Sequence, residues 1–244
     1  MEVLGYSERG IINSLFYEMR SSQNSLELLG EFLALVSFPY RAVKFQIFDA
    51  RILVEQSFSD FGDADAVLLV NNRGHRQVVF IEAKVKTFQR RYWRIVDEFE
   101  QFKRGIDKER VSSSNLFAQL YHKVRLVKAL QTGGSRQLHD GVRFPGCSSK
   151  QDRRIGRNRV VLRAVDQVEG YCKDALFAAL LPDDIANLGA FYDRTLRDYS
   201  PEGFQEWDIG NWGHLSWLQV EEFCKRRDLL ATLRTFEYNE GQIY

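Results

Sequence analysis

The chain has 244 residues and a formal net charge of +1. Hydrophobic residues make up 44% of it, which is ample for one hydrophobic core, so we expect a single domain over residues 1–244. No apolar run approaches the roughly 18 residues that a membrane-spanning helix needs, and no basic segment leads into an apolar one at the N-terminus, which argues against a membrane protein and a secretory signal. Three scattered cysteines, Cys147, Cys172 and Cys224, lack the spacing of a metal site, and reduced thiols in a cytoplasmic protein fit them best.

The first elements along the chain are expected to be helical and then extended. Between residues 7 and 36, apolar positions recur at helical spacing, with Ser7 as a candidate N-cap. Pro39 then ends the helical segment. Residues 43–57 alternate between apolar and polar side chains, which predicts one strand or two short ones.

A β-hairpin is predicted next, with unusual charges at its ends. Asp65 opens one apolar run, Glu82 and Lys84 close a second, and the linker between the runs is rich in turn formers. Because strand side chains alternate between faces, Glu82 and Lys84 should share one face and Ala83 should lie on the other. Burying such charges costs several kcal/mol each unless they are paired or bound to metal. The hairpin is therefore the candidate site.

The second half of the chain predicts further helices and one more buried strand. The expectations, in chain order, are a polar insertion that is helical or mobile at 88–112, a helix at 112–130 that Gly133 and Gly134 end, a connection at 131–158, a short helix at 160–171, a buried strand at 175–182 and a small C-terminal helix at 216–234. The core order is helix, three strands, helix, strand. We therefore expect an α/β fold with a mixed β-sheet flanked by helices.

The basic residues are concentrated in the middle of the chain. Between Lys84 and Arg163 there are 20 Lys or Arg residues against 7 Asp or Glu, with basic insertions at about 86–112 and 131–158. Such asymmetry is typical of a surface that binds a polyanion, although solvated helix faces would give the same pattern. The candidate nucleic-acid contacts are Lys86, Arg90, Arg91, Arg94, Lys123, Arg153, Arg154 and Arg157.

Asp65 followed by E-A-K at 82–84, within this order of elements, resembles the PD-(D/E)xK nuclease superfamily. The resemblance covers about residues 7–182 and implies a restriction-endonuclease-like αβββαβ core, whereas the C-terminal extension at 183–244 has no counterpart. Ala64 stands where the family has Pro. Asp63 and Glu55 remain alternative members of the acidic cluster.

The resemblance implies a catalytic set for this chain. Its members are Asp65, Glu82, Lys84, Glu18 and Gln119. The implied ligands of Mg²⁺ or Mn²⁺ are Asp65, Glu82, the Ala83 carbonyl and Glu18. Lys84 would orient the attacking water or stabilise the developing charge, and Gln119 would hold the site or contact the nucleic-acid backbone. The plainer interpretations are a Glu82–Lys84 ion pair at a strand edge and a solvated Glu18.

The resemblance therefore predicts a metal-dependent nuclease, with double-stranded DNA as the expected partner. A catalytically inactive nucleic-acid-binding module on the same fold is the alternative. A third hypothesis is a protein-interaction domain whose basic residues meet an acidic partner. Cutting both strands of a duplex with one site per chain would favour a homodimer.

Overall fold

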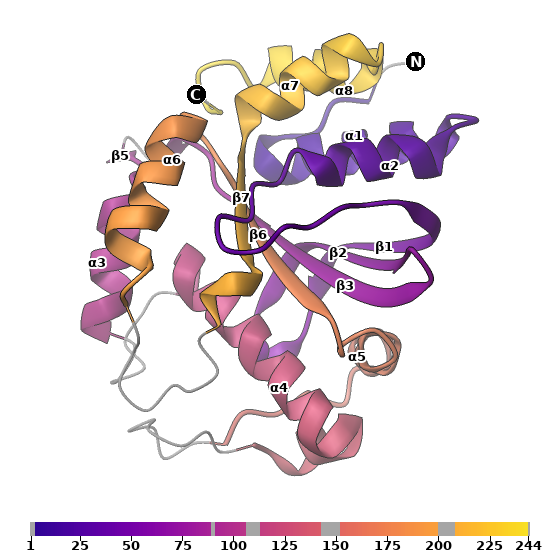
Figure 1. Cartoon of the computed structure of the whole chain (residues 1–244), viewed down its shortest axis with the longest axis vertical. Helices are drawn as coiled ribbons and strands as arrows, with labels where there is room; N and C mark the ends of the chain where they lie inside the picture. The colour runs from indigo at the N-terminus through magenta and orange to yellow at the C-terminus, as the bar shows by residue number, and fades with distance from the viewer. Residues whose placement is uncertain (1–2, 89–90, 106–112, 143–151, 200–207, 244) are drawn as a thin grey trace.

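A computed structural model describes residues 3–88, 91–105, 113–142, 152–199 and 208–243 (Figure 1). Arg90 and Cys147, singled out above, lie outside these ranges. Cys172 and Cys224 are free and buried, as expected for reduced thiols. Within the described ranges, no helix is both long and apolar enough to cross a membrane.

A five-stranded mixed sheet forms the centre of the structure, with the strand order β1-β2-β3-β6-β7. Its strands are β1 (Ile47–Ser57), β2 (Asp63–Asn72), β3 (His75–Ala83), β6 (Ala175–Leu181) and β7 (Trp212–Ser216). The first three form an antiparallel meander, and β6 and β7 continue the sheet in parallel with β3. A separate ribbon pairs β4 (Thr87–Phe88) with β5 (Arg91–Tyr92). The predicted α/β fold with a mixed sheet is confirmed.

The predicted hairpin is β2 and β3, joined by a tight turn. Arg73 and Gly74 at its tip both have positive φ, 53° and 84°. Two successive positive φ angles are typical of the type I′ turn, whose twist matches that of the strands. The register pairs Ala66 with Ile81, so the carboxyl end of β3 lies beside the start of β2.

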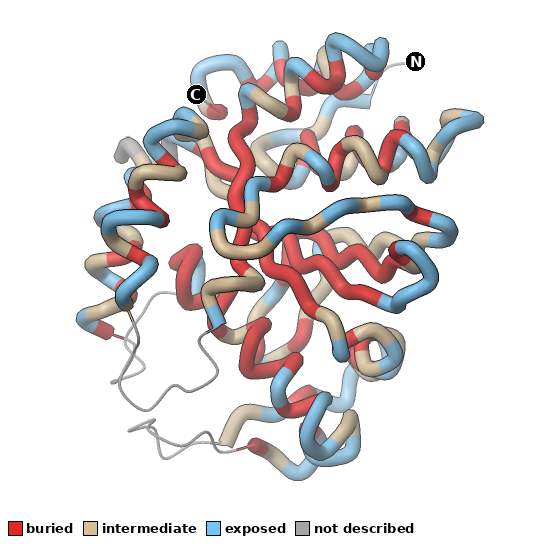
Figure 2. The backbone as a smooth tube through the Cα atoms, in the orientation of Figure 1, coloured by how far each residue is buried: buried red, intermediate tan, exposed pale blue. Residues whose placement is uncertain are grey.

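Helices cover both faces of the sheet (Figure 1). They are α1 (Ser7–Ser21), α2 (Ser25–Ala34), α3 (Ile95–Gly105), α4 (Leu116–Asp140), α5 (Arg159–Glu169), α6 (Ile185–Phe191), α7 (Trp217–Arg226) and α8 (Leu230–Tyr238), with short helical turns at Ser59–Phe61, Tyr192–Leu196 and Ile209–Asn211. One face packs against α1, α2, α7 and α8, and the other against α3, α4, α5 and α6, which gives two apolar layers. Strands β2, β3, β6 and β7 are buried along most of their length, whereas the edge strand β1 is mostly half-buried or exposed (Figure 2).

The structure corrects three local expectations. Ser7 does not cap α1 but is its first residue, with φ of 64°, and its hydroxyl donates to the Glu8 carboxylate instead. Gly134 breaks the helix as expected, with φ of 68°, but the residues after it are again helical as far as Asp140, where a connection was expected. Strand β7 was missed because its few residues are buried on both faces and show no alternation.

Candidate active site

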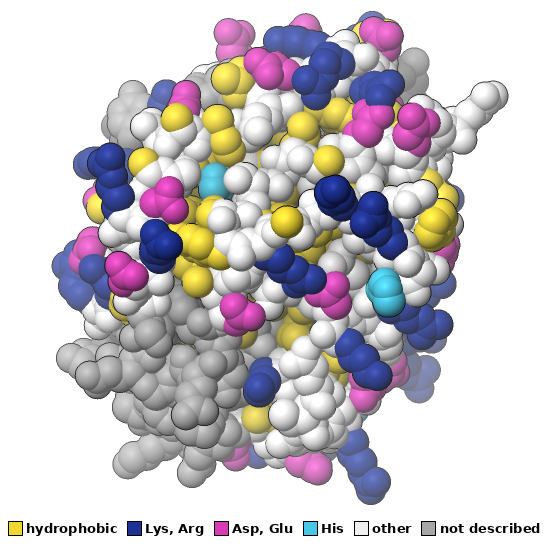
Figure 3. Space-filling model, viewed as in Figure 1, with side chains coloured by type: hydrophobic (Ala, Val, Ile, Leu, Met, Phe, Trp, Pro, Cys, Tyr) yellow, Lys and Arg dark blue, Asp and Glu magenta, His cyan; other side chains and the backbone are white. Residues whose placement is uncertain are grey.

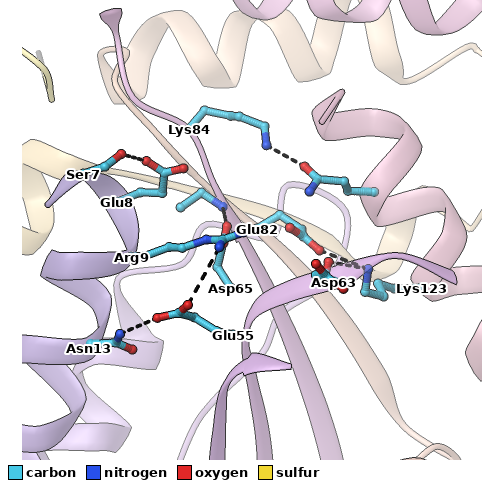
Figure 4. Close-up of polar contacts among 12 residues, drawn as sticks. Ser7, Glu8, Arg9, Asn13, Glu55, Asp63, Asp65, Glu82, Lys84 and Lys123 are labelled. Carbon is cyan, nitrogen blue, oxygen red and sulfur yellow. Dashed lines mark hydrogen bonds and ion pairs between the residues drawn. The ribbon is translucent and has the colours of Figure 1, made fainter. Parts of the chain in front are cut away.

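Asp65 and Glu82 come together where β2 begins and β3 ends (Figure 4). The backbone N–H of Ala83 donates a hydrogen bond of 2.7 Å to Asp65 Oδ2, which fixes the Asp65 side chain against the end of β3. The negative charge of Asp65 also helps to raise the pKa of Glu82. Two carboxylates that are distant in the sequence thus share one end of the sheet.

Glu82 lies in a fully buried ion pair with Lys123 of α4. The two side chains are 0% exposed, and Lys123 Nζ lies 3.3 Å from Glu82 Oε1. Burial raises the pKa of Glu82 to about 7, and Lys123 opposes that rise. Burial likewise lowers the pKa of Lys123, which Glu82 opposes. The prediction that Lys123 contacts nucleic acid is wrong, because its ammonium group is sealed inside the protein.

Lys84 points to α4 as well, but to a different residue. Its Nζ donates to Gln119 Oε1 at 2.5 Å, and its side chain is half-buried. Ala83 packs on the opposite face, in the layer with α1 and α2. The predicted alternation of Glu82, Ala83 and Lys84 is therefore confirmed, and Glu82 has Lys123 rather than Lys84 as its ion-pair partner.

Glu18 is committed to a structural role, so its predicted place in the catalytic set is wrong. Its carboxylate accepts hydrogen bonds from Ala231 N at 3.0 Å, Thr232 N at 2.8 Å and Thr232 Oγ1 at 2.7 Å. Two of these donors are backbone N–H groups at the N-terminus of α8, and the third is the Thr232 hydroxyl. An acidic side chain is stabilising there because the first N–H groups of a helix have no partner within it.

The acidic residue of α1 that does reach the site is Glu8, which the sequence analysis missed. Burial is the largest cause of its raised pKa, and Asp65 raises it further while Lys84 lowers it. Both acids lie on the same helix, so the sequence offered no signal for choosing between them. The choice depends on how far α1 extends along the sheet.

Arg9 lies between Asp65 and Glu55, close to both carboxylates. Its Nε lies 3.7 Å from Asp65 Oδ1, and its Nη1 lies 3.8 Å from Glu55 Oε2. Asn13 also donates to Glu55, at 2.6 Å. Asp63 is exposed. The carboxylate that accepts the hydrogen bond from Ala83 N, at the end of β3, is that of Asp65. The geometry therefore favours Asp65 over Asp63 and Glu55 as the partner of Glu82.

The donor set fits a hydrated hard cation. The buried Glu82 carboxylate has the Lys123 ammonium group 3.3 Å from its Oε1, and its Oε2 has no hydrogen-bond partner. No three His, Cys, Asp or Glu residues gather into a metal-binding cluster in the described parts of the chain. Mg²⁺ usually keeps several waters and is bound through one or two carboxylates, so Asp65 and Glu82 are suited to it, whereas a dedicated all-protein cage is not present in those parts.

Access to the two carboxylates is unequal. Asp65 is 7% exposed and Lys84 half-buried, whereas Glu82 is completely buried. A cation would therefore have to enter past Asp65 and Lys84, and it would reach Glu82 only if the side chains that cover this carboxylate moved.

The other predicted nucleic-acid contacts lie in varied surroundings. Lys86, Arg94, Arg154 and Arg157 are exposed. Arg153 is half-buried, and its guanidinium donates to the Asp60 carbonyl. Arg90 and the side chain of Arg91 lie outside what the structure describes. On the face in Figure 3, the visible Lys and Arg side chains are interspersed with Asp and Glu and do not form one basic band.

Comparison of the chain with protein-family models, with curated proteins and with solved structures gave no match. Its function has therefore to follow from the chemistry of the site. That chemistry consists of two carboxylates from neighbouring strands, one half-buried ammonium held by an amide, and one sealed ammonium.

Proposed function

We propose that this chain is a metal-dependent nuclease of the PD-(D/E)xK type, which hydrolyses phosphodiester bonds in DNA with Mg²⁺ or Mn²⁺. The observation that supports it most strongly is the meeting of Asp65 and Glu82, from adjacent strands, beside the half-buried Lys84. This set combines oxygen ligands for a hard cation with a positive charge for the reacting phosphate.

The topology supports the same proposal. Helix α1 precedes the β1–β2–β3 meander, and α4 lies between β3 and its parallel neighbour β6. This succession, in which α3 and α5 also lie between β3 and β6, is compatible with the αβββαβ core that the resemblance implies, and Asp65 and Glu82 lie at neighbouring strand ends. Strand β7 and the helices around it are additions to that order.

Each side chain has a distinct task in the proposed reaction. Asp65 and Glu82 hold the cation, which when bound lowers the pKa of a water ligand and neutralises charge on the phosphate. Lys84 places its ammonium group where negative charge develops, and Gln119 fixes the direction of that ammonium through the 2.5 Å hydrogen bond.

DNA is the proposed substrate because exposed basic side chains follow the site in the sequence. Lys86 follows β3 closely, Arg94 lies between β5 and α3, and Arg154 and Arg157 precede α5. Binding through phosphates would weaken steeply with salt, because each contact releases counterions from the duplex. Cutting both strands would require two sites, so the proposal includes a homodimer on the substrate.

An inactive nucleic-acid-binding module is the second candidate, and one observation favours it. Glu82 is sealed from solvent and already neutralised by Lys123. A carboxylate in that state serves the stability of the fold without any metal. The two candidates differ in whether Glu82 ever meets a cation.

Plasmid cleavage separates the candidates. We expect the wild-type chain to cut plasmid DNA with Mg²⁺ but not with EDTA, and Asp65→Asn to lose cleavage while it keeps DNA binding. Asp63→Asn is the matched control, since Asp63 lies on the same strand but is exposed, and it should cut normally. Cleavage by Asp65→Asn would contradict the site. DNA binding without cleavage by the wild type would favour the inactive module. If the wild type neither binds nor cuts DNA, the remaining hypothesis is a protein-interaction domain with an acidic partner.

A further inference from the structure

The ammonium group of Lys123 lies inside a cage of oxygen atoms (Figure 4). Its Nζ is 3.3 Å from Glu82 Oε1, 3.1 Å from the Phe61 carbonyl and 2.7 Å from the Asp63 carbonyl. Carboxylate and backbone carbonyl oxygens are the ligands that hard metal ions take in proteins. The lysine thus occupies a position whose surroundings resemble a cation site.

The chain before β2 is shaped around this ammonium group. Gly62 has φ of 76°, and a Cβ there would lie 3.5 Å from Lys123 Nζ. The positive φ turns the backbone so that the carbonyls of Phe61 and Asp63, on either side, both point at the same nitrogen. The backbone around Gly62 is therefore arranged to accept hydrogen bonds from the buried Lys123 ammonium group.

Charge explains why the lysine and Glu82 depend on each other. Both are 0% exposed, and an uncompensated charge in such a place is very costly. Lys123 meets Glu82 through Oε1, whereas Glu82 Oε2 accepts no hydrogen bond. One oxygen of the carboxylate is thus engaged by the built-in ammonium, and the other is left for a second positive partner beside Asp65.

We propose that Lys123 is a built-in cation that fills one cation position of the site, so that the Asp65–Glu82 pair takes a single divalent ion. This rests on the proposed function, because it concerns the same two carboxylates. A second divalent ion would have to displace the ammonium from its three oxygens or lie next to it, where the two positive charges repel each other.

Calorimetric titration with Mn²⁺ tests the proposal. We expect one ion per chain in the wild type and one additional ion per chain in Lys123→Ala, which removes the ammonium and leaves its oxygens free. Lys128→Ala is the matched control, because Lys128 is an exposed lysine of the same helix, and it should bind as the wild type does. Identical stoichiometry and affinity in Lys123→Ala and the wild type would overturn the proposal and leave the nuclease function standing.

Two further outcomes bear on this inference and on the proposed function together. If the wild type binds no Mn²⁺ but Lys123→Ala binds one ion, the wild-type pair takes no divalent ion, and both the single-ion proposal and the metal-dependent function are overturned. If neither protein binds Mn²⁺, both are overturned.

If Lys123→Ala fails to fold, the proposal is still tested by whether Mn²⁺ restores its folding and by whether a second variant folds. The double variant Lys123→Met, Glu82→Gln carries no uncompensated charge and should fold without metal. We expect Mn²⁺ to restore the folding of Lys123→Ala, measured by its melting temperature. A double variant that folds, together with a single variant that Mn²⁺ does not rescue, would overturn the proposal.

Discussion

Strand β3 has a polar cluster at each end, and the two clusters differ in how their carboxylates are satisfied. At the start of the strand, Asp174 accepts hydrogen bonds from Gln77 at 2.6 Å and Arg41 at 3.0 Å, one on each oxygen. Arg41 also donates to Asn211 at 2.7 Å. At the other end, Glu82 has the Lys123 ammonium group 3.3 Å from Oε1 and no hydrogen-bond partner for Oε2.

This difference distinguishes a structural cluster from a candidate functional one. A buried polar group normally has its hydrogen bonds made within the protein, because leaving one unmade costs free energy. Asp174, which is partly exposed, meets this rule on both oxygens, whereas the fully buried Glu82 leaves its Oε2 without a partner. An unsatisfied carboxylate at a strand end, beside a second acid, is what a cation-binding site would require.

The largest effect that we expect is on stability, from Lys123→Met. This change leaves Glu82 buried without a counter-ion and should lower the free energy of unfolding by about 3–5 kcal/mol, measured by urea denaturation. Arg41→Met, at the other end of β3, should cost at most about 1 kcal/mol because that ion pair is partly exposed. Equal losses in the two variants would contradict the comparison.

The next largest effect is expected on stability at acidic pH, where His214 of β7 takes up a proton. Burial lowers the pKa of His214 to about 4, below its ordinary value of 6.5, and its Nδ1 has no hydrogen-bond partner. The unfolded chain therefore takes up the proton first, so stability is full above pH 6.5 and falls as the pH drops towards 4. The loss should approach about 3 kcal/mol. His214→Gln should remove this part of the pH dependence in urea denaturation, and an unchanged profile would contradict the assignment.

Cleavage should separate the two ends of β3 directly. Lys84→Ala removes the ammonium that Gln119 positions and should reduce the rate of DNA cleavage about 100-fold or more, with little change in melting temperature. Arg41→Ala removes a cation from the structural cluster and should leave the rate unchanged. A comparable loss of rate in both variants would mean that the effect comes from stability.

The smallest effect expected is from Glu18→Ala. Loss of the acceptor for the α8 N-terminus should cost about 1 kcal/mol of stability and should not change cleavage. Glu222→Ala, an exposed acid on α7, should change neither and serves as the control. Reduced cleavage by a stable Glu18→Ala variant would restore Glu18 to the catalytic set.

Local chemistry made part of this structure predictable from the sequence. The turn formers before β3 predicted the hairpin, and the two-residue period of a strand placed Glu82 and Lys84 on one face with Ala83 on the other. The predicted helix that begins in this part of the chain is α4, and the Asn115 side chain caps it by accepting from Ala118 N. Each of these depends on residues close together in the chain.

What the sequence alone determined about this protein is therefore the β2–β3 hairpin and the faces of Glu82, Ala83 and Lys84, because both follow from short-range periodicity and turn chemistry. Only the tertiary structure decided that Glu8 and not Glu18 approaches the site, and that Lys123 is sealed against Glu82. These outcomes depend on how far helices α1 and α4 extend along the sheet. That placement is fixed by the packing of whole apolar layers, which no local pattern contains.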